Sequence, residues 1–162
     1  MKEFNRKDLN TEALVTKALE EARQIHSKPS TARDRSLEEI FKSSVYGLAA
    51  EQYLIEKCGF TDDDRKYKDV ISPEGIPVEI KVTEGSYYIY DVLKRCKEAK
   101  KEEWRDYPDW VFIYTNNRKS DCYVLDNSYK WNGKRFVPCD FEADISLEED
   151  REFLANYEGV NN

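Results

Sequence analysis

Residues 68–83 read KDVISPEGIPVEIKVT, two short apolar runs separated by a Ser-Pro-Glu-Gly segment. That segment has the composition of a turn, so the stretch predicts two strands joined at residues 72–75. Because side chains alternate across a strand, the aliphatic residues of the second strand share one face, while Glu79 and Lys81 share the other. Asp69 lies ten positions before Glu79. This spacing lets two adjacent antiparallel strands place both carboxylates at one end of the sheet.

The rest of the chain predicts helices and strands around this pair. Capping boxes that begin at Ser36 and Ser146 start two helices, and Gly59 ends the first of them. An apolar periodicity of 3.6 predicts the other helices, and Asn132-Gly133 predicts a hairpin turn. The expected helices are 8–26, 36–58, 88–104 and 146–158; the further strands are 110–115, 121–126 and a hairpin over 129–137. The order predicts a mixed α/β protein with a central mixed sheet flanked by helices.

The length of 162 residues predicts one domain. We divide it into an N-terminal helix with a basic linker (1–35), a core (36–137) and an acidic C-terminal segment (138–162). The last segment holds eight acidic residues and one basic residue, which accounts for the whole net charge of −7. The remainder is neutral, so a polyanionic partner is compatible with it.

Composition excludes several classes of protein. The 3 Trp, 11 Tyr and 7 Phe residues argue against a disordered chain. No apolar run is long enough to cross a membrane, and the first residues do not open a signal peptide. The 4 cysteines form no Cys-x-x-Cys and there is only 1 histidine, so we expect buried thiols in a cytoplasmic protein instead of a zinc site or a disulfide framework.

Three acidic residues fit poorly on a solvated surface. The helical neighbours of Glu51 three and four positions away are glycine or aliphatic, so its carboxylate lies on the packing face or at its rim. Asp69 and Glu79, with a main-chain carbonyl, would form a hard oxygen site that suits Mg²⁺, or Mn²⁺ as a substitute. A lysine beside such a site could orient and help deprotonate a water molecule. The alternative is an amphipathic strand with a solvated Glu79–Lys81 ion pair.

Glu51 on a helix, followed by Asp69 and then by Glu79-Ile80-Lys81 on a strand, resembles the PD-(D/E)XK nuclease superfamily. The resemblance covers residues 36–126 and implies a restriction-endonuclease-like fold. The family's proline is replaced by Lys68, and Thr83 stands where some branches carry Gln or Glu.

The resemblance also implies roles for these residues. Asp69, Glu79 and the carbonyl oxygen of Ile80 would bind Mg²⁺, Lys81 would assist the attacking water, and Glu51 would assist the metal site. The implied activity is that of a Mg²⁺-dependent endodeoxyribonuclease with no organic cofactor. The alternative is a non-catalytic protein that uses this fold, either a regulatory subunit or an inhibitor that mimics DNA.

Basic and aromatic side chains near the implied centre are candidates for contact with DNA. They are Tyr87, Tyr88, Lys94, Arg95, Lys134 and Arg135. A solvated helix face explains the basic residues of the helix equally well, and core packing explains at least one of the tyrosines. Because an enzyme of this size with one active site cuts one strand, we expect a homodimer with helix 8–26 in its interface. The alternative for that helix is packing against its own domain.

Overall fold

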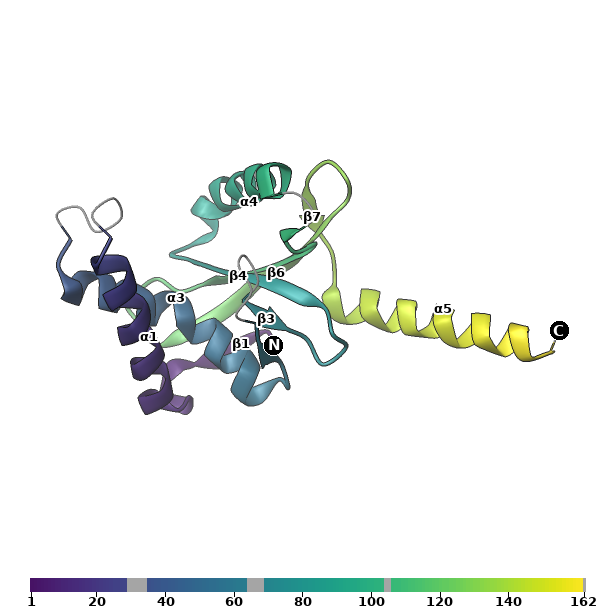
Figure 1. The fold of residues 1–162 in the computed structure, drawn as a ribbon, viewed down its shortest axis with the longest axis horizontal. Helices are drawn as coiled ribbons and strands as arrows, with labels where there is room; N and C mark the ends of the chain where they lie inside the picture. Colours follow the sequence, from purple (N-terminus) through teal and green to yellow (C-terminus); the bar gives the residue numbers. More distant parts are fainter. Residues whose placement is uncertain (29–34, 64–68, 104–105, 162) are drawn as a thin grey trace.

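A mixed sheet of seven strands separates two groups of helices in the computed structural model, which describes residues 1–28, 35–63, 69–103 and 106–161 (Figure 1). The strands are β1 Glu3–Asn5, β2 Thr61–Asp62, β3 Val70–Ile71, β4 Pro77–Thr83, β5 Trp110–Thr115, β6 Cys122–Trp131 and β7 Phe136–Pro138. Their order is β1-β6-β5-β4-β3-β2, and β7 pairs with β6. Only β4 and β5 pair in parallel; the other pairs of this sheet, among the described residues, are antiparallel. The predicted mixed α/β class is confirmed.

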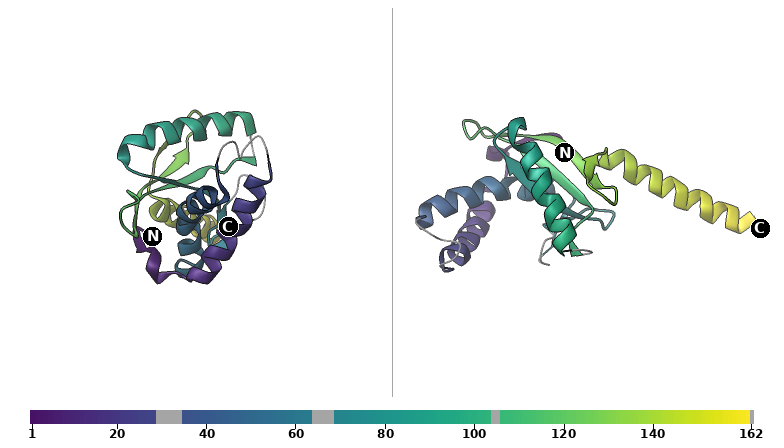
Figure 2. Two further views of the ribbon diagram at one scale, coloured as in Figure 1. Left: turned by 90° about the vertical axis from the view of Figure 1, so that its left-hand side faces the viewer. Right: turned by 90° about the horizontal axis from the view of Figure 1, so that it is seen from above.

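Helices cover both faces of the sheet. They are α1 Thr11–His26, α3 Leu37–Lys57, α4 Ile89–Glu103 and α5 Phe141–Asn161, with 3₁₀ turns at Arg6–Asp8 and Ser86–Tyr88. α1 and α3 lie on one face and α4 on the other, as the views in Figure 2 show. The predicted linker residues 29–34 and Lys68 lie outside the described residues.

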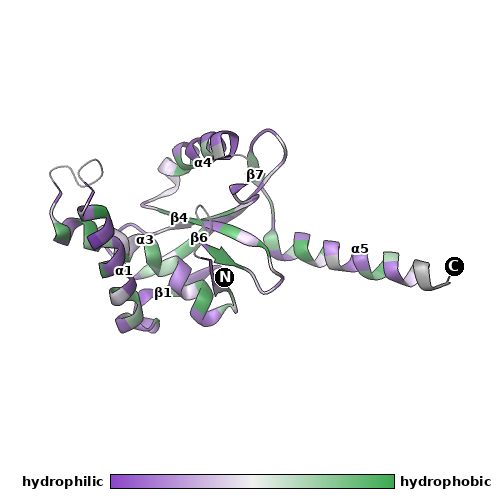
Figure 3. Cartoon of the chain, in the orientation of Figure 1, coloured by the Kyte–Doolittle hydropathy of each residue, from purple (hydrophilic) through white to green (hydrophobic). Residues whose placement is uncertain are grey.

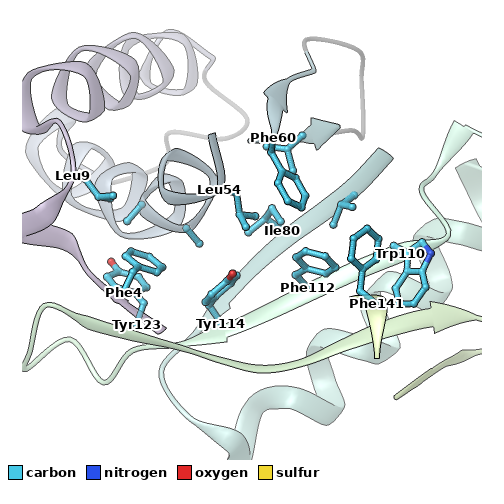
Figure 4. Packing of buried hydrophobic residues seen from close by; sticks show 14 of the residues in the cluster. Phe4, Leu9, Leu54, Phe60, Ile80, Trp110, Phe112, Tyr114, Tyr123 and Phe141 are labelled. Carbon is cyan, nitrogen blue, oxygen red and sulfur yellow. The ribbon is translucent and has the colours of Figure 1, made fainter. Parts of the chain in front are cut away.

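The core has two parts because strand side chains alternate between the two faces. On the α1/α3 face, aromatic residues from distant parts of the chain pack together, including Phe4, Phe112 and Phe141 (Figure 4). The α4 face buries a smaller set, which includes Val92 of the helix with Val111 and Ile113 of the central strand. The predicted strand 110–115 is thus buried on both faces, as an interior strand requires.

Caps explain where two helices begin. Asn10 accepts a hydrogen bond from the N–H of Ala13 at 3.1 Å and starts α1. Ser36 accepts one from the N–H of Glu39 at 3.1 Å, as the capping box predicts. α3 ends before Gly59, whose φ of +76° lies in the left-handed region that glycine adopts without strain.

The apolar stripe of α1 is covered by the same chain. Leu14, Ala18 and Ala22 are buried, and α1 packs along α3. The alternative, packing of this helix against its own domain, accounts for the buried stripe, and the homodimer with helix 8–26 in its interface stays a prediction.

The predicted strands differ from the observed ones in two respects. The short strands β1 and β2 were not predicted; they form by pairing with β6 and β3. β6 runs without a break over residues 122–131, where two separate strands were expected. The expected break is absent because Trp110–Ile113 of β5 pairs with residues 127–130. The turn at residues 132–135 is as predicted, with Gly133 at a φ of +99°.

The last helix begins earlier than the sequence predicts. Asp140 accepts a hydrogen bond from the N–H of Ala143 at 3.2 Å, so it caps a helix that starts at Phe141 instead of near Ser146. The hydroxyl of Ser146 instead donates to the carbonyl of Glu142 at 3.0 Å, inside the helix. The true start is favoured because it buries Phe141 and Ile145.

This reassignment makes a prediction about stability. Asp140→Ala removes a cap and is expected to lower the free energy of unfolding by about 1 kcal/mol in urea denaturation. Ser146→Ala is the matched control and should leave stability unchanged or slightly raise it, because alanine favours a helix interior. A larger loss from Ser146→Ala than from Asp140→Ala would contradict the assigned cap.

Two expectations from composition can also be compared with the structure. No described helix is both long and apolar enough to span a membrane. The four cysteines are free, as expected, but only Cys96 is buried, and Cys122 is exposed.

Candidate functional site

β4 presents Glu79 and Lys81 on the face of the sheet that α4 covers. The parallel register with β5 places Glu79 beside Val111 and Lys81 beside Ile113, and both of these β5 residues belong to the core under α4. Cys96 of α4 is buried in the same core, on the side of the sheet that Lys81 faces. The Glu79 side chain is 10% exposed and that of Lys81 is 41% exposed, so the lysine connects a buried acid with solvent.

Asp69 lies immediately before β3, the strand that pairs antiparallel with β4. One carboxylate oxygen, Oδ2, accepts a hydrogen bond from the main-chain N–H of Ile80 at 2.7 Å. Since the N–H and C=O of one strand residue point to the same side, the Ile80 carbonyl also points toward this edge of β4 and away from β5. The short β3 strand thereby brings the predicted carbonyl and the Asp69 carboxylate together.

The three predicted groups Asp69, Glu79 and Lys81 form one cluster. Glu79 Oε1 lies 3.2 Å from Lys81 Nζ, and the two carboxyl groups are within hydrogen-bonding reach of each other when one carries a proton. The other oxygen, Glu79 Oε2, is buried and has no hydrogen-bond partner among the described residues. A buried carboxylate oxygen without a donor is unfavourable and is expected to receive a cation or a proton.

The electrostatics of this cluster follow from burial and like charge. Burial, and after it the Asp69 carboxylate, raises the pKa of Glu79 to about 8, although Lys81 attracts its charge. Burial also raises the pKa of Asp69, against the hydrogen bond from Ile80 and the charge of Lys81. For Lys81, burial lowers the pKa, but Glu79 and its other neighbours outweigh burial and the pKa is raised. Lys81 is therefore an ammonium group and a hydrogen-bond donor at neutral pH.

Glu51 approaches the cluster from the opposite face of the sheet. It lies on α3, its side chain is 8% exposed, and its Oε1 is 2.9 Å from Lys17 Nζ on α1. Burial, and then the charge of Asp69, raises the pKa of Glu51 to about 7, partly offset by Lys17. Lys17 also lies 3.4 Å from Asp62. Glu51 thus neighbours Asp69 but takes a lysine as its direct partner.

The donors present fit a hard divalent cation in part. Asp69, Glu79 and the Ile80 carbonyl supply oxygen ligands of the kind that Mg²⁺ prefers, and the buried Glu79 Oε2 is open to one. Across the described ranges, which omit residues 64–68, no three acidic, histidine or cysteine side chains converge as a ready metal centre. Glu51, on the opposite face of the sheet, is paired with Lys17 and is not part of this donor set.

The structure brings together some of the predicted DNA contacts. Tyr87 and Tyr88 lie in the turn after β4, exposed, with their rings edge to face at 5.4 Å. Lys94 on α4 and Arg135 before β7 line one groove, while Arg95 and Lys134 are exposed nearby in sequence. We call this groove of about 440 Å³ the α4–β7 groove; its lining is Tyr90, Leu93, Lys94, Lys97, Arg135, Phe136, Val137 and Pro138.

Lys17 is the site residue that sequence reasoning missed. Lys17 directly precedes Ala18, which is buried in the apolar stripe of α1. A charged residue beside a packing face was the feature of the sequence that could have indicated a buried partner for Lys17. Its partner depends on the register between α1 and α3, which the sequence does not specify.

Comparisons with known proteins add no assignment. No family model matches the chain, and no curated protein matches it. The functional conclusion therefore depends on the geometry of the Asp69–Glu79–Lys81 cluster.

Proposed function

We propose that the chain is a Mg²⁺-dependent endodeoxyribonuclease of the PD-(D/E)XK type, which hydrolyses DNA phosphodiester bonds. The observation that supports this most is the convergence of Asp69, Glu79 and Lys81 at one edge of β4, with the buried Glu79 Oε2 lacking a donor among the described residues. A buried carboxylate oxygen without a donor is costly, so a bound cation is one way to satisfy Glu79 Oε2.

Each residue has a distinct role in this proposal. Asp69, Glu79 and the Ile80 carbonyl would hold the cation, which when bound supplies Lewis acidity and lowers the pKa of water. Lys81 would donate hydrogen bonds to the attacking water and to a phosphate oxygen, because it is protonated and reaches solvent. Glu51 would tune the charge of Asp69 from the other face.

Incubation with plasmid DNA tests the proposal. We expect strand cleavage with Mg²⁺ or Mn²⁺, none in EDTA, and none from Lys81→Ala under either condition. Lys57→Ala is the matched control, since Lys57 is an exposed lysine at the end of α3. Absence of metal-dependent cleavage of plasmid and single-stranded DNA by the wild-type chain, or full activity of Lys81→Ala, would refute the proposal.

A non-catalytic interaction protein is the second candidate. The feature that favours it is α5, which projects from the body with exposed acidic and apolar side chains (Figure 1). An acidic helix can imitate the charge of DNA. Inhibition of a nuclease by the wild-type chain, in the absence of cleavage of its own, would support this candidate.

A further inference from the structure

Only the beginning of α5 is supported by the body of the protein. Phe141 and Ile145 are buried, and Lys130 pairs with Asp144 at 2.7 Å and with Glu148 at 3.5 Å. Beyond this point the helix extends away from the sheet in Figure 1 and in the right-hand view of Figure 2. An unsupported helix of this length is marginal in water, so the projecting part needs a partner surface.

The projecting part has a defined apolar stripe. Leu147, Phe153, Leu154 and Tyr157 are each more than half exposed, and hydrophobic positions recur along the helix in Figure 3. Asp150 lies within this stripe, because its neighbours three and four positions away include Leu147, Phe153 and Leu154. A surface that covers the stripe must therefore combine an apolar floor with a cation for Asp150.

Pairing of α5 with a second α5 does not meet this requirement. The exposed side chains beside the stripe include Glu148 and Glu152, with Arg151 as the basic residue of this stretch. Two such helices would bring like charges together and would bury Asp150 against apolar side chains.

The α4–β7 groove does meet the requirement. Leu93, Phe136, Val137 and Pro138 contribute apolar surface, and no acidic side chain is part of its lining within the described structure. Its cations Lys94, Lys97 and Arg135 form no ion pair with any described residue. The groove thus offers unpaired positive charge beside an apolar floor.

A second apolar groove in the molecule fits less well. It lies between α1 and α3, has a volume of about 450 Å³ and also has basic residues at its edge. There Arg6 and Lys7 pair with Asp121 at 2.7 and 3.5 Å, and Lys42 pairs with Glu38 at 3.2 Å. Its cations are already neutralised, so Asp150 would gain less.

We propose that α5 of one copy docks into the α4–β7 groove of a second copy, with Asp150 paired to the Lys94, Lys97 and Arg135 cluster. A second copy is required because α5 begins three residues after β7, at the edge of its own groove, and points away from it. A two-fold axis lets each copy give its helix and receive the other, so both grooves are filled.

Charge reversal tests this exchange directly. A groove variant carries Lys94→Glu, Lys97→Glu and Arg135→Glu; a helix variant carries Glu148→Lys, Asp150→Lys and Glu152→Lys. Light scattering is expected to give about 38 kDa for the wild type, twice the chain mass of 19.1 kDa, at tens of micromolar. Each variant alone should associate at least tenfold more weakly, because like charges then meet.

Mixing the two variants is the decisive step. The acidic helix of one then meets the basic groove of the other, and the basic helix meets the acidic groove, so a one-to-one heterodimer should form. Its formation also shows that both variants are folded. Arg6→Glu with Lys42→Glu, in the α1/α3 groove, is the matched control and should leave the wild-type mass unchanged.

Several outcomes would overturn the proposal. The wild type could be monomeric, or the groove variant could still dimerise. The dimer could be lost only in the variant with Arg6→Glu and Lys42→Glu, or the mixture of groove and helix variants could form no heterodimer. If the wild type is monomeric and the groove variant binds an oligonucleotide more weakly than the wild type does, the groove is instead assigned to nucleic acid. None of these measurements depends on nuclease activity.

Discussion

Asp69→Asn and Glu79→Gln are each expected to abolish Mg²⁺-dependent cleavage and to weaken Mg²⁺ binding, whereas Lys81→Ala abolishes cleavage and leaves binding largely intact. Under the proposed function, the two acids supply oxygen ligands to the cation, whereas Lys81 acts on the water and the phosphate. The expected loss of cleavage from Lys81→Ala is at least about 100-fold. Calorimetric titration with Mg²⁺ separates binding from catalysis.

The amide variants are chosen to preserve the fold. In Asp69→Asn, the introduced amide keeps an oxygen that can accept the 2.7 Å hydrogen bond from the N–H of Ile80. Lys57→Ala controls for the general loss of one positive charge. If Lys81→Ala lost Mg²⁺ affinity as fully as Asp69→Asn, the division of roles would be wrong.

Glu51→Gln is expected to stabilise the metal-free protein by about 3 kcal/mol at pH 8 and to have almost no effect at pH 4. The pKa of Glu51 is raised from 4.5 to about 7, and each pKa unit corresponds to about 1.4 kcal/mol. Between these two values the folded state holds a proton that the unfolded state has released, so wild-type stability falls as the pH rises. Glutamine does not titrate, so the variant avoids this loss.

Urea denaturation across the pH range measures the effect. Glu20→Gln is the matched control, since it makes the same substitution at an exposed position of α1. A Glu51→Gln variant less stable than wild type at pH 8 would show that the Lys17 ion pair outweighs burial. Under the proposed function, the same substitution also lowers the rate of cleavage.

The sequence predicted the parts of the fold that local patterns determine. β4, β5 and their connection by α4 follow from alternation, from a run of apolar residues and from helical periodicity. β1 and β2 carry no such pattern, since three and two residues form strands only when β6 and β3 lie beside them. The start of α5 was wrong because two capping residues, Asp140 and Ser146, compete, and burial of Phe141 decides between them.

The candidate site was predictable to the same extent. The spacing of Asp69, Glu79 and Lys81 along two neighbouring strands was sufficient to bring them together. The position of Glu51 relative to them was not, because it depends on how α1 and α3 pack. Lys17 shows the difference: it is 34 residues from Glu51 in the chain and 2.9 Å from it in space.

The place of Asp69 immediately before β3 has a consequence for how the protein could be modified. A complete sheet separates the charges on its two sides, but Asp69 interacts with Lys17 on one side and with Lys81 on the other. Substitutions on the solvent-facing back of α1 could therefore adjust the acidity of the centre from a distance, without changing any group that touches the substrate. Under the proposed function, sequence variation in the first helix would then change the pH range of the reaction on the far side of the sheet.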